Sequence, residues 1–247
     1  MLDLDQIRQD FPTIGKNDIY LDSVASSLTP TPVIEAMAEY YTKYRANIHR
    51  GTYDLSMRAS QRYDDAVASV ARFIGACPSE IAFTQNTTHA INLLARTLQF
   101  EPGDEIVLTS LEHTSNMAPW VRLADEKGLE LRWYNAGRLG IVNASELIDL
   151  IGPKTKLVTM TAVSNVLGTI TPFEEIGAEC RDRGVLFLLD AAQAVPHISI
   201  DVKKIQCDFL AFSGHKMLGP TGIGVLYLRE ELARSLGPGM VGGGTLD

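Results

Sequence analysis

Groups of polar and charged side chains stand at the ends of five apolar runs in this sequence. The groups are Gln85-Asn-Thr-Thr88, Ser110-Leu-Glu-His113, Ser164-Asn165, Asp190 with Gln193, and Ser213-Gly-His-Lys216. Together they supply hydroxyls, imidazoles, amides, a carboxylate and a lysine. Ligands of open α/β sheets bind at the carboxyl ends of the strands, so side chains that follow successive strands meet there. We therefore expect these groups to form a single site.

The chemistry of the set indicates the kind of ligand. The hydroxyls of Thr87 and Thr88, at the start of a helix-compatible stretch, suit a phosphate group. Lys216 can bond covalently to an aldehyde carbon, and Asp190 can hold a proton on a ring nitrogen and make that ring an electron sink. His113 can lie against the face of the ring. A planar ligand with a phosphate, an aldehyde and a ring nitrogen meets these needs, and the prediction is pyridoxal phosphate (PLP).

Each of these residues also has a purely structural interpretation. Asp190 at a strand end can cap the next helix, and Thr87 and Thr88 can cap the helix that they begin. Lys216 can be a solvated lysine of a glycine-rich loop. The remaining side chains, Asn165, Gln193 and His113, can satisfy loop backbone groups. The functional interpretation depends on their coincidence at one sheet edge in the order hydroxyls, His, Asn, Asp, Lys.

The elements that position these residues follow from the hydrophobic pattern. Seven apolar runs predict strands: Glu80–Thr84, Glu105–Thr109, Leu129–Tyr134, Lys156–Val163, Val185–Leu189, Asp208–Phe212 and Ile223–Leu228. Helix-compatible stretches are Pro32–Tyr44, Met57–Ile74, Thr88–Leu98, Asn116–Lys127, Ala144–Ile151 and Glu174–Arg183. This alternation predicts an α/β fold with a mainly parallel seven-stranded sheet and helices on both faces. The last strand is expected to be antiparallel, because the loop 213–222 holds no clear crossover helix.

Composition excludes several classes of function. The 247 residues carry 30 acidic and 22 Lys/Arg side chains, a formal charge of −8, which disfavours a nucleic-acid partner. No apolar stretch approaches the roughly 20 residues of a membrane span, so no membrane partner is expected. The acidic N-terminus lacks an export signal, and three scattered cysteines do not form a disulfide framework. The five histidines show no metal-ligand spacing, so no metal site is expected. These features predict a reduced, cytoplasmic protein.

Motifs along nearly the whole chain carry a family resemblance. They are Tyr20-Leu-Asp-Ser-Val-Ala25, Asn47-Ile-His-Arg-Gly-Thr52, Asn86-Thr-Thr-His-Ala-Ile-Asn92, Glu112-His-Thr-Ser-Asn116, Ser164-Asn-Val-Leu-Gly168, Asp190-Ala-Ala-Gln-Ala194 and Ser213-Gly-His-Lys-Met-Leu-Gly-Pro220. With these motifs the chain resembles the cysteine desulfurases of the SufS/Csd group, which are class V aminotransferase-fold PLP enzymes. The resemblance implies the large domain of a PLP-dependent transferase-like protein of fold type I. It also implies conversion of L-cysteine to L-alanine, with sulfur passed as a persulfide to an acceptor protein for iron–sulfur cluster assembly, in a homodimer.

The resemblance assigns roles to individual residues. Lys216 matches the lysine that bonds the cofactor and moves the substrate Cα proton, and Asp190 matches the partner of the ring nitrogen. His113 matches the histidine stacked on the ring, with an acid–base role, and Gln193 matches the donor to the phenolic oxygen. Positions that match phosphate, substrate or entrance residues of the family are Thr87, Thr88, Ser213 and His215 (phosphate), Asn165 (substrate carboxylate and ring oxygen), and Ala25, His49 and Arg50 (substrate entrance).

The resemblance also predicts a domain division. Residues 1–18 are expected to be an N-terminal segment, 19–236 the PLP-binding large domain, and 237–247 a tail toward an absent C-terminal small domain. In the family that domain carries the persulfide-forming cysteine and an arginine for the substrate carboxylate. Cys77, Cys180 and Cys207 lie outside the motif context of that cysteine and are interpreted as structural. Two alternatives stay open: another enzyme of this fold class (selenocysteine lyase, epimerase, kynureninase-like hydrolase or aminotransferase), or a non-catalytic PLP-binding remnant.

Overall fold

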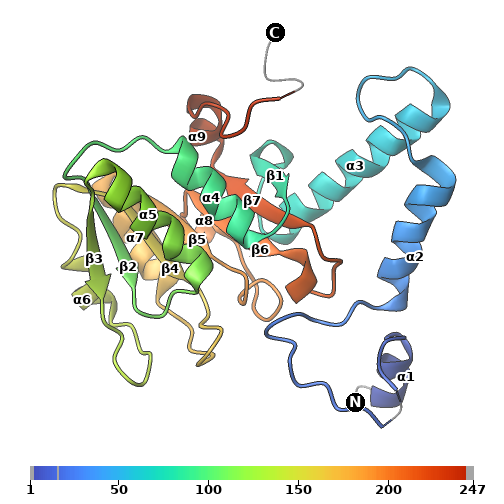
Figure 1. Ribbon diagram of the computed structural model, residues 1–247, viewed down its shortest axis with the longest axis horizontal. Helices are drawn as coiled ribbons and strands as arrows, with labels where there is room; N and C mark the ends of the chain where they lie inside the picture. Colours follow the sequence, from blue (N-terminus) through green and yellow to red (C-terminus); the bar gives the residue numbers. More distant parts are fainter. Residues whose placement is uncertain (1–2, 16, 243–247) are drawn as a thin grey trace.

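The computed structural model describes residues 3–15 and 17–242, and its described residues contain one seven-stranded sheet (Figure 1). The strands, in the order β1-β7-β6-β5-β4-β2-β3 across the sheet, are β1 Ile81–Thr84, β7 Gly224–Leu228, β6 Phe209–Ser213, β5 Leu186–Asp190, β4 Thr155–Thr161, β2 Glu105–Thr109 and β3 Glu130–Tyr134. β7 runs antiparallel to both of its neighbours, and the other pairs are parallel. The expected mainly parallel sheet with an antiparallel last strand is confirmed.

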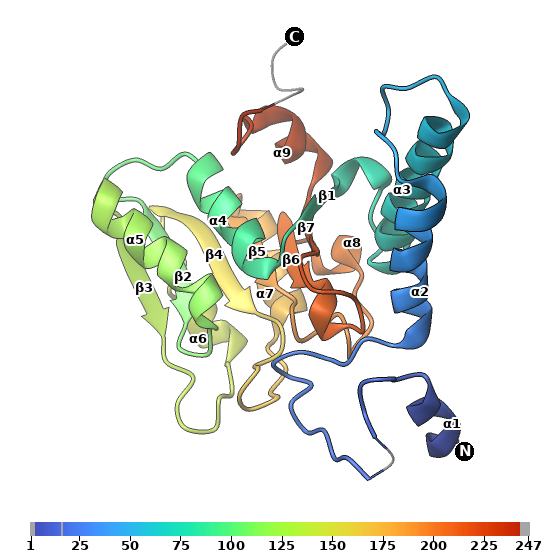
Figure 2. The ribbon, with the colours of Figure 1, turned by 45° about the vertical axis from the view of Figure 1, so that its right-hand side comes forward.

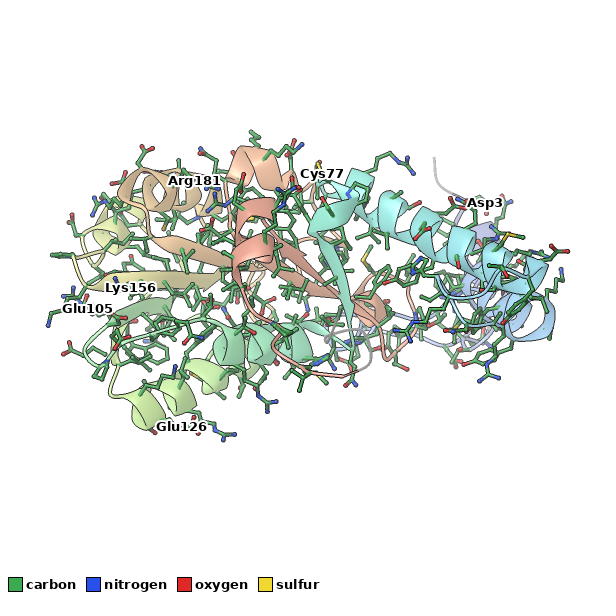
Figure 3. All side chains as sticks on the ribbon, turned by 90° about the horizontal axis from the view of Figure 1, so that it is seen from above. Asp3, Cys77, Glu105, Glu126, Lys156 and Arg181 are labelled. Carbon is green, nitrogen blue, oxygen red and sulfur yellow. The ribbon has the colours of Figure 1, made fainter. Side chains whose placement is uncertain are left out.

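Helices cover both faces of the sheet, as expected. One face packs against α4 (Thr87–Thr97), α5 (Ala118–Lys127) and α9 (Glu230–Ser235), and the other against α6 (Ala144–Ile148), α7 (Phe173–Arg183) and α8 (Val202–Ile205). In Figure 3 the labelled Glu126 of α5 and Arg181 of α7 mark these two sides. Residues alternate between the two cores: Ile106 and Leu108 of β2 join the first, and Val107 joins the second. This double covering explains why the strands are apolar almost throughout.

Two helices extend beyond the β1 edge of the sheet (Figures 1 and 2). The first, α2 (Thr31–Glu39), continues as a π-helix over Tyr40–Tyr44, which the sequence did not reveal. The second, α3 (Asp54–Phe73), begins three residues before the expected start at Met57. Its C-terminal end leads into the core, where Ile74, the residue after the helix, is fully buried.

The N-terminal part of the chain crosses the carboxyl edge of the sheet (Figure 2). Ser27 anchors it, because its N–H donates to the carbonyl of His215 at 2.8 Å and its Oγ accepts from the Leu218 N–H at 2.8 Å. A short helix, α1 (Leu4–Gln9), precedes this crossing. The domain boundaries at residues 18 and 236 stay predictions, and part of the expected tail, residues 243–247, lies outside the described residues.

No helix within residues 3–15 and 17–242 has the length and apolar character needed to cross a membrane. The same residues contain no group of three or more His, Cys, Asp or Glu side chains arranged to hold a metal ion.

Candidate cofactor-binding site

A cavity of about 440 Å³ opens at the carboxyl edge of the sheet. The residues that line it are Asp22, Val24, Ala25, Asn86, Thr87, Thr88, His113, Ser115, Thr161, Asn165, Asp190, Ala192, Gln193, Ser213, His215 and Lys216. Strand register brings several of them together, because Thr161 of β4 pairs with Asp190 of β5, which pairs with Ala211 of β6. Polar groups distant in sequence therefore share one hollow, as the topology predicts.

Every residue predicted to contact the cofactor lines this cavity: Thr87, Thr88, His113, Asn165, Asp190, Gln193, Ser213, His215 and Lys216. Ala25, predicted at the substrate entrance, lies there too. His49 and Arg50 are not among the lining residues. Instead, His49 lies beside α3, with its Nε2 3.0 Å from Asp64 Oδ1. The individual roles of all these residues stay predictions.

Hydroxyl groups from two elements form a cup at the start of α4. Thr87 and Ser213 are buried, their hydroxyl oxygens lie 2.7 Å apart, and the Thr87 N–H donates to Ser213 Oγ at 2.9 Å. The side chain of Asn86 caps the helix by accepting from the His89 N–H at 2.8 Å. The N-terminal end of a helix attracts anions through its N–H groups and its dipole. The cup is therefore suited to a phosphate.

Gly224 is the residue that lets β7 pass behind this cup. A Cβ at this position would lie 2.6 Å from the Asn86 Cα, a backbone atom that cannot rotate away. Gly224→Ala should therefore displace the 85–88 turn, weaken PLP binding about tenfold and lower the unfolding free energy by about 1–3 kcal/mol. Fluorescence titration with PLP and urea unfolding measure the two effects. Gly237→Ala, with no atom within 4 Å of the added Cβ, is the control; unchanged PLP affinity in Gly224→Ala would contradict this interpretation.

The carboxyl of Asp190 and the amine of Lys216 influence each other across the cavity. Burial raises the pKa of Asp190, while a hydrogen bond from the Ala192 N–H at 3.0 Å and the positive charges of Lys216 and His113 act in the opposite direction. Burial lowers the pKa of Lys216, and the charge of Asp190 offsets part of that effect. A lysine that loses its proton more easily than an exposed one is a better nucleophile. Lys216 therefore has the environment of a covalent attachment site.

His215 lies between Lys216 and the N-terminal crossing. Burial, and then the nearby charge of Lys216, lower its pKa. Its Nδ1 lies 3.3 Å from Ser26 Oγ. On the other side of the crossing, the Gln193 amide donates to the carbonyl of Val24 at 2.8 Å. One N–H of that amide remains for a ligand, because a primary amide has two donors.

The half-buried Glu112, next to His113 in the chain, is a lining-loop residue to which the sequence analysis assigned no role. Glu112 Oε1 accepts from Thr109 Oγ1 and Oε2 accepts from Asn116 Nδ2, each at 2.6 Å. Asn116 Oδ1 in turn accepts from Thr159 Oγ1 at 2.7 Å, which ties the loop to β4. Burial raises the pKa of Glu112 to about 8 despite these hydrogen bonds. The carboxyl therefore holds its proton at neutral pH in the folded protein.

The raised pKa of Glu112 predicts a pH-dependent stability. The folded protein binds this proton up to about pH 8, whereas an unfolded glutamate releases it near pH 4.5. Its contribution is full below pH 4.5 and is lost as the pH rises toward 8, by up to about 1.4 kcal/mol per pH unit. Glu112→Gln should remove this slope, as urea unfolding at pH 5, 6.5 and 8 would show. Glu126→Gln, at an exposed glutamate of α5, should keep it; a slope unchanged in Glu112→Gln would contradict the assignment.

The sequence analysis assigned no individual role to several residues that line the cavity: Asp22, Val24, Asn86, Ser115, Thr161 and Ala192. Among them, Ser115 makes the most informative contacts, to Thr88 and to His113. Its position inside the motif Glu112–Asn116 was the available signal.

The donors of this cavity fit PLP. The Thr87–Ser213 cup offers hydroxyls and a helix start for the phosphate, the buried carboxyl of Asp190 has one oxygen bonded to Ala192 and a second available to a ring nitrogen, and Lys216 offers an amine. All three lie along one cavity, as a single planar ligand requires. The residues therefore fit the group.

The sequence model of the aminotransferase class-V family matches residues 19–247. The chain belongs to this family. A probable cysteine desulfurase of Pyrococcus abyssi is 48% identical over 249 residues, which cover 98% of this chain and 61% of that protein. The solved apo structure of cysteine desulfurase from Thermococcus onnurineus has a TM-score of 0.95 and 47% identity, covering 100% of this chain and 62% of that one.

Another similar solved structure is that of SspA in complex with cysteine, with a TM-score of 0.81, 31% identity, and coverage of 86% of this chain and 62% of that one. The chain thus spans less than two thirds of the length of these proteins. Fold type I, the family and its cofactor PLP, predicted from the motifs, are confirmed.

Proposed function

We propose that this class-V chain is the PLP-binding part of a cysteine desulfurase, which converts L-cysteine to L-alanine and passes the sulfur on as a persulfide. The observation that carries the proposal is the shared cavity of Lys216, Asp190 and the Thr87–Ser213 cup. The names of the two relatives and the bound cysteine of the SspA structure support the substrate.

In the proposed mechanism, bound PLP supplies an electron sink that stabilises negative charge at the substrate Cα. Lys216 holds the cofactor covalently and moves the Cα proton. Asp190 keeps a proton on the ring nitrogen. Its burial in the cavity strengthens the attraction between its carboxylate and the protonated nitrogen. His113, which lines the cavity, would lie against the ring and act as an acid–base group. The hydrogen-bonding positions are Thr87, Thr88, Ser213 and His215 for phosphate, Gln193 for the phenolic oxygen, and Asn165 for the ring oxygen and the substrate carboxylate; Ala25, His49 and Arg50 belong to the entrance.

We propose that none of the described cysteines is the thiol that takes the sulfur. Burial raises the pKa of Cys180 to about 12 and raises that of Cys207 further, so neither readily forms the thiolate that this chemistry needs. Cys77 is half-buried, and none of the three lines the cavity. We place the persulfide thiol, with the arginine for the substrate carboxylate, in the small domain that the sequence motifs imply, beyond a large domain of residues 19–236.

We further propose a homodimer that delivers sulfur to an acceptor protein for iron–sulfur cluster assembly in the cytoplasm. The three free cysteines support a reducing compartment, because thiols that remain unpaired are usual there.

The test separates cofactor binding from turnover. Protein incubated with PLP should absorb visible light, and borohydride should remove this band and leave PLP attached. In a separate, unreduced sample of the protein that includes the small domain, L-cysteine should yield L-alanine, with sulfide released when a reductant is present, in preference to L-selenocysteine and L-kynurenine. A protein that stays colourless with PLP would overturn the proposal. If PLP attaches but another amino acid is turned over instead of L-cysteine, the protein would be a different enzyme of the class-V family, and the proposed substrate would be wrong.

A further inference from the structure

One hydroxyl group in the cavity links Thr88 to His113. Ser115 Oγ lies 2.7 Å from Thr88 Oγ1, at the phosphate cup, and 3.0 Å from Nδ1 of His113. Thr88 belongs to the first turn of α4, whereas Ser115 belongs to the 3-10 helix Thr114–Asn116 that follows β2. The fold therefore brings Thr88 to the locally paired Ser115 and His113, and the three polar groups form one chain.

The backbone decides which nitrogen of His113 is an acceptor. The Ser115 N–H donates to His113 Nδ1 at 3.1 Å, so Nδ1 presents a lone pair. The neutral ring consequently carries its proton on Nε2. Ser115 Oγ–H is the second group that can donate to the same lone pair.

A hydroxyl has a single proton, and this limits what the chain of groups can do. If Ser115 donates to Nδ1, it accepts the proton of Thr88, and Thr88 has none left for an anion. If Thr88 donates to an anion, it accepts the proton of Ser115, and Ser115 presents a lone pair to Nδ1. In the second arrangement Nδ1 loses one of its two donors and gains an acceptor, so binding of a proton there becomes more favourable.

We propose that Ser115 is a positioning residue that couples a phosphate at Thr88 to the proton of His113. Phosphate in the cup reverses the direction of the hydrogen bond between the hydroxyls of Thr88 and Ser115. This reversal raises the proportion of His113 that carries a proton on Nδ1. The effect expected from one neutral hydrogen bond is about three- to tenfold in the ratio of protonated to free Nδ1. Because such coupling is reciprocal, the proton on Nδ1 tightens phosphate binding by the same factor. The inference rests on the proposed function, in which Thr88 contacts the cofactor phosphate.

Other charged groups also act on His113 and must be separated from this coupling. Asp190 at the end of β5 attracts a protonated ring, Lys216 after β6 repels it, and Glu112 lies next to it in the loop after β2. A phosphate dianion attracts it as well. These charged groups are the same in wild type and in a Ser115 variant. A difference between the two proteins in the protonation of His113 on phosphate binding therefore reports the coupling through the hydroxyls of Thr88 and Ser115.

The experiment uses ¹⁵N-histidine-labelled protein without PLP and inorganic phosphate as the probe. The ¹⁵N shift of Nδ1, assigned by its loss in His113→Gln, gives the ratio of protonated to free nitrogen at one fixed pH. Phosphate should raise this ratio about three- to tenfold more in wild type than in Ser115→Ala. Ser115→Thr, which keeps the hydroxyl, should restore the wild-type response, and Thr114→Ala, at the exposed neighbour, should not change it.

Equal responses in wild type and Ser115→Ala would overturn the coupling. The absorbance test with PLP distinguishes this failure from failure of the proposed function. If PLP attaches and the responses are equal, the proposed function stands and the coupling is wrong. If neither PLP nor phosphate binds, both are wrong.

Discussion

Lys216→Ala should abolish the covalent attachment of PLP. Lys216 is the only lysine among the described residues that line the cavity, and burial lowers its pKa, so it is the amine placed to bond the aldehyde carbon of the cofactor. After incubation with PLP and borohydride, the mass of the wild-type protein should increase by one reduced cofactor, and the mass of the variant should not. Any turnover of L-cysteine should fall at least about 10³-fold, because both the attachment and the proton transfer are lost.

The matched control for this experiment is Lys156→Ala. Lys156 is an exposed residue of β4 at the opposite edge of the sheet and is labelled in Figure 3. This variant should gain the same mass as wild type. A reduced adduct of undiminished yield in Lys216→Ala would place the attachment on another residue.

Asp190→Asn should reduce turnover by about 10²- to 10⁴-fold while it weakens PLP binding by less than about tenfold. The asparagine keeps the shape and the hydrogen bond from the Ala192 N–H, but not the negative charge that would hold a proton on the ring nitrogen. Much of the cofactor's affinity would come from the phosphate cup and the bond to Lys216, which this variant leaves intact. Steady-state kinetics with L-cysteine and a PLP titration measure the two effects separately.

An unfolding measurement completes the Asp190 experiment. Because burial raises the pKa of Asp190, replacing a costly buried charge by an amide should leave stability unchanged or increased. A loss of turnover in a stable variant is then chemical in origin. Asp182→Asn, at an exposed position of α7, should behave as wild type. Full turnover in Asp190→Asn would show that the carboxylate does not hold the ring proton.

The strands and most of the site could be predicted because they depend on local pattern. The run Val185–Leu189 is apolar throughout, and β5 was found at Leu186–Asp190, buried on both faces. The absence of a crossover helix in the loop 213–222 leads directly to the antiparallel pairing of β6 and β7. Since strand ends define the ligand edge, residues that follow the strands were located correctly.

The remaining contacts could not be predicted because they join segments without a common local signal. Ser115 and Thr88 are 27 residues apart, and Gln193 and Val24 are 169 apart. None of these four residues has a local sequence signal that identifies its partner before the fold brings the two together. His49 shows another case, since its motif predicted a place at the substrate entrance, whereas its side chain lies beside α3, with Nε2 3.0 Å from Asp64 Oδ1, so its role stays a prediction.

The hydrogen bonds between Ser27 and the loop that carries Lys216 affect the order of events during synthesis. The two partners are separated by 188 residues, so Ser27 leaves the ribosome long before His215 is added to the chain. Contacts of such large sequence separation form late, because the entropy of closing the long loop opposes them until the intervening sheet has assembled. The cavity around Lys216 is therefore complete only after β6 and the loop that follows it have been synthesised, so we expect PLP to bind the finished chain and not a shorter nascent one.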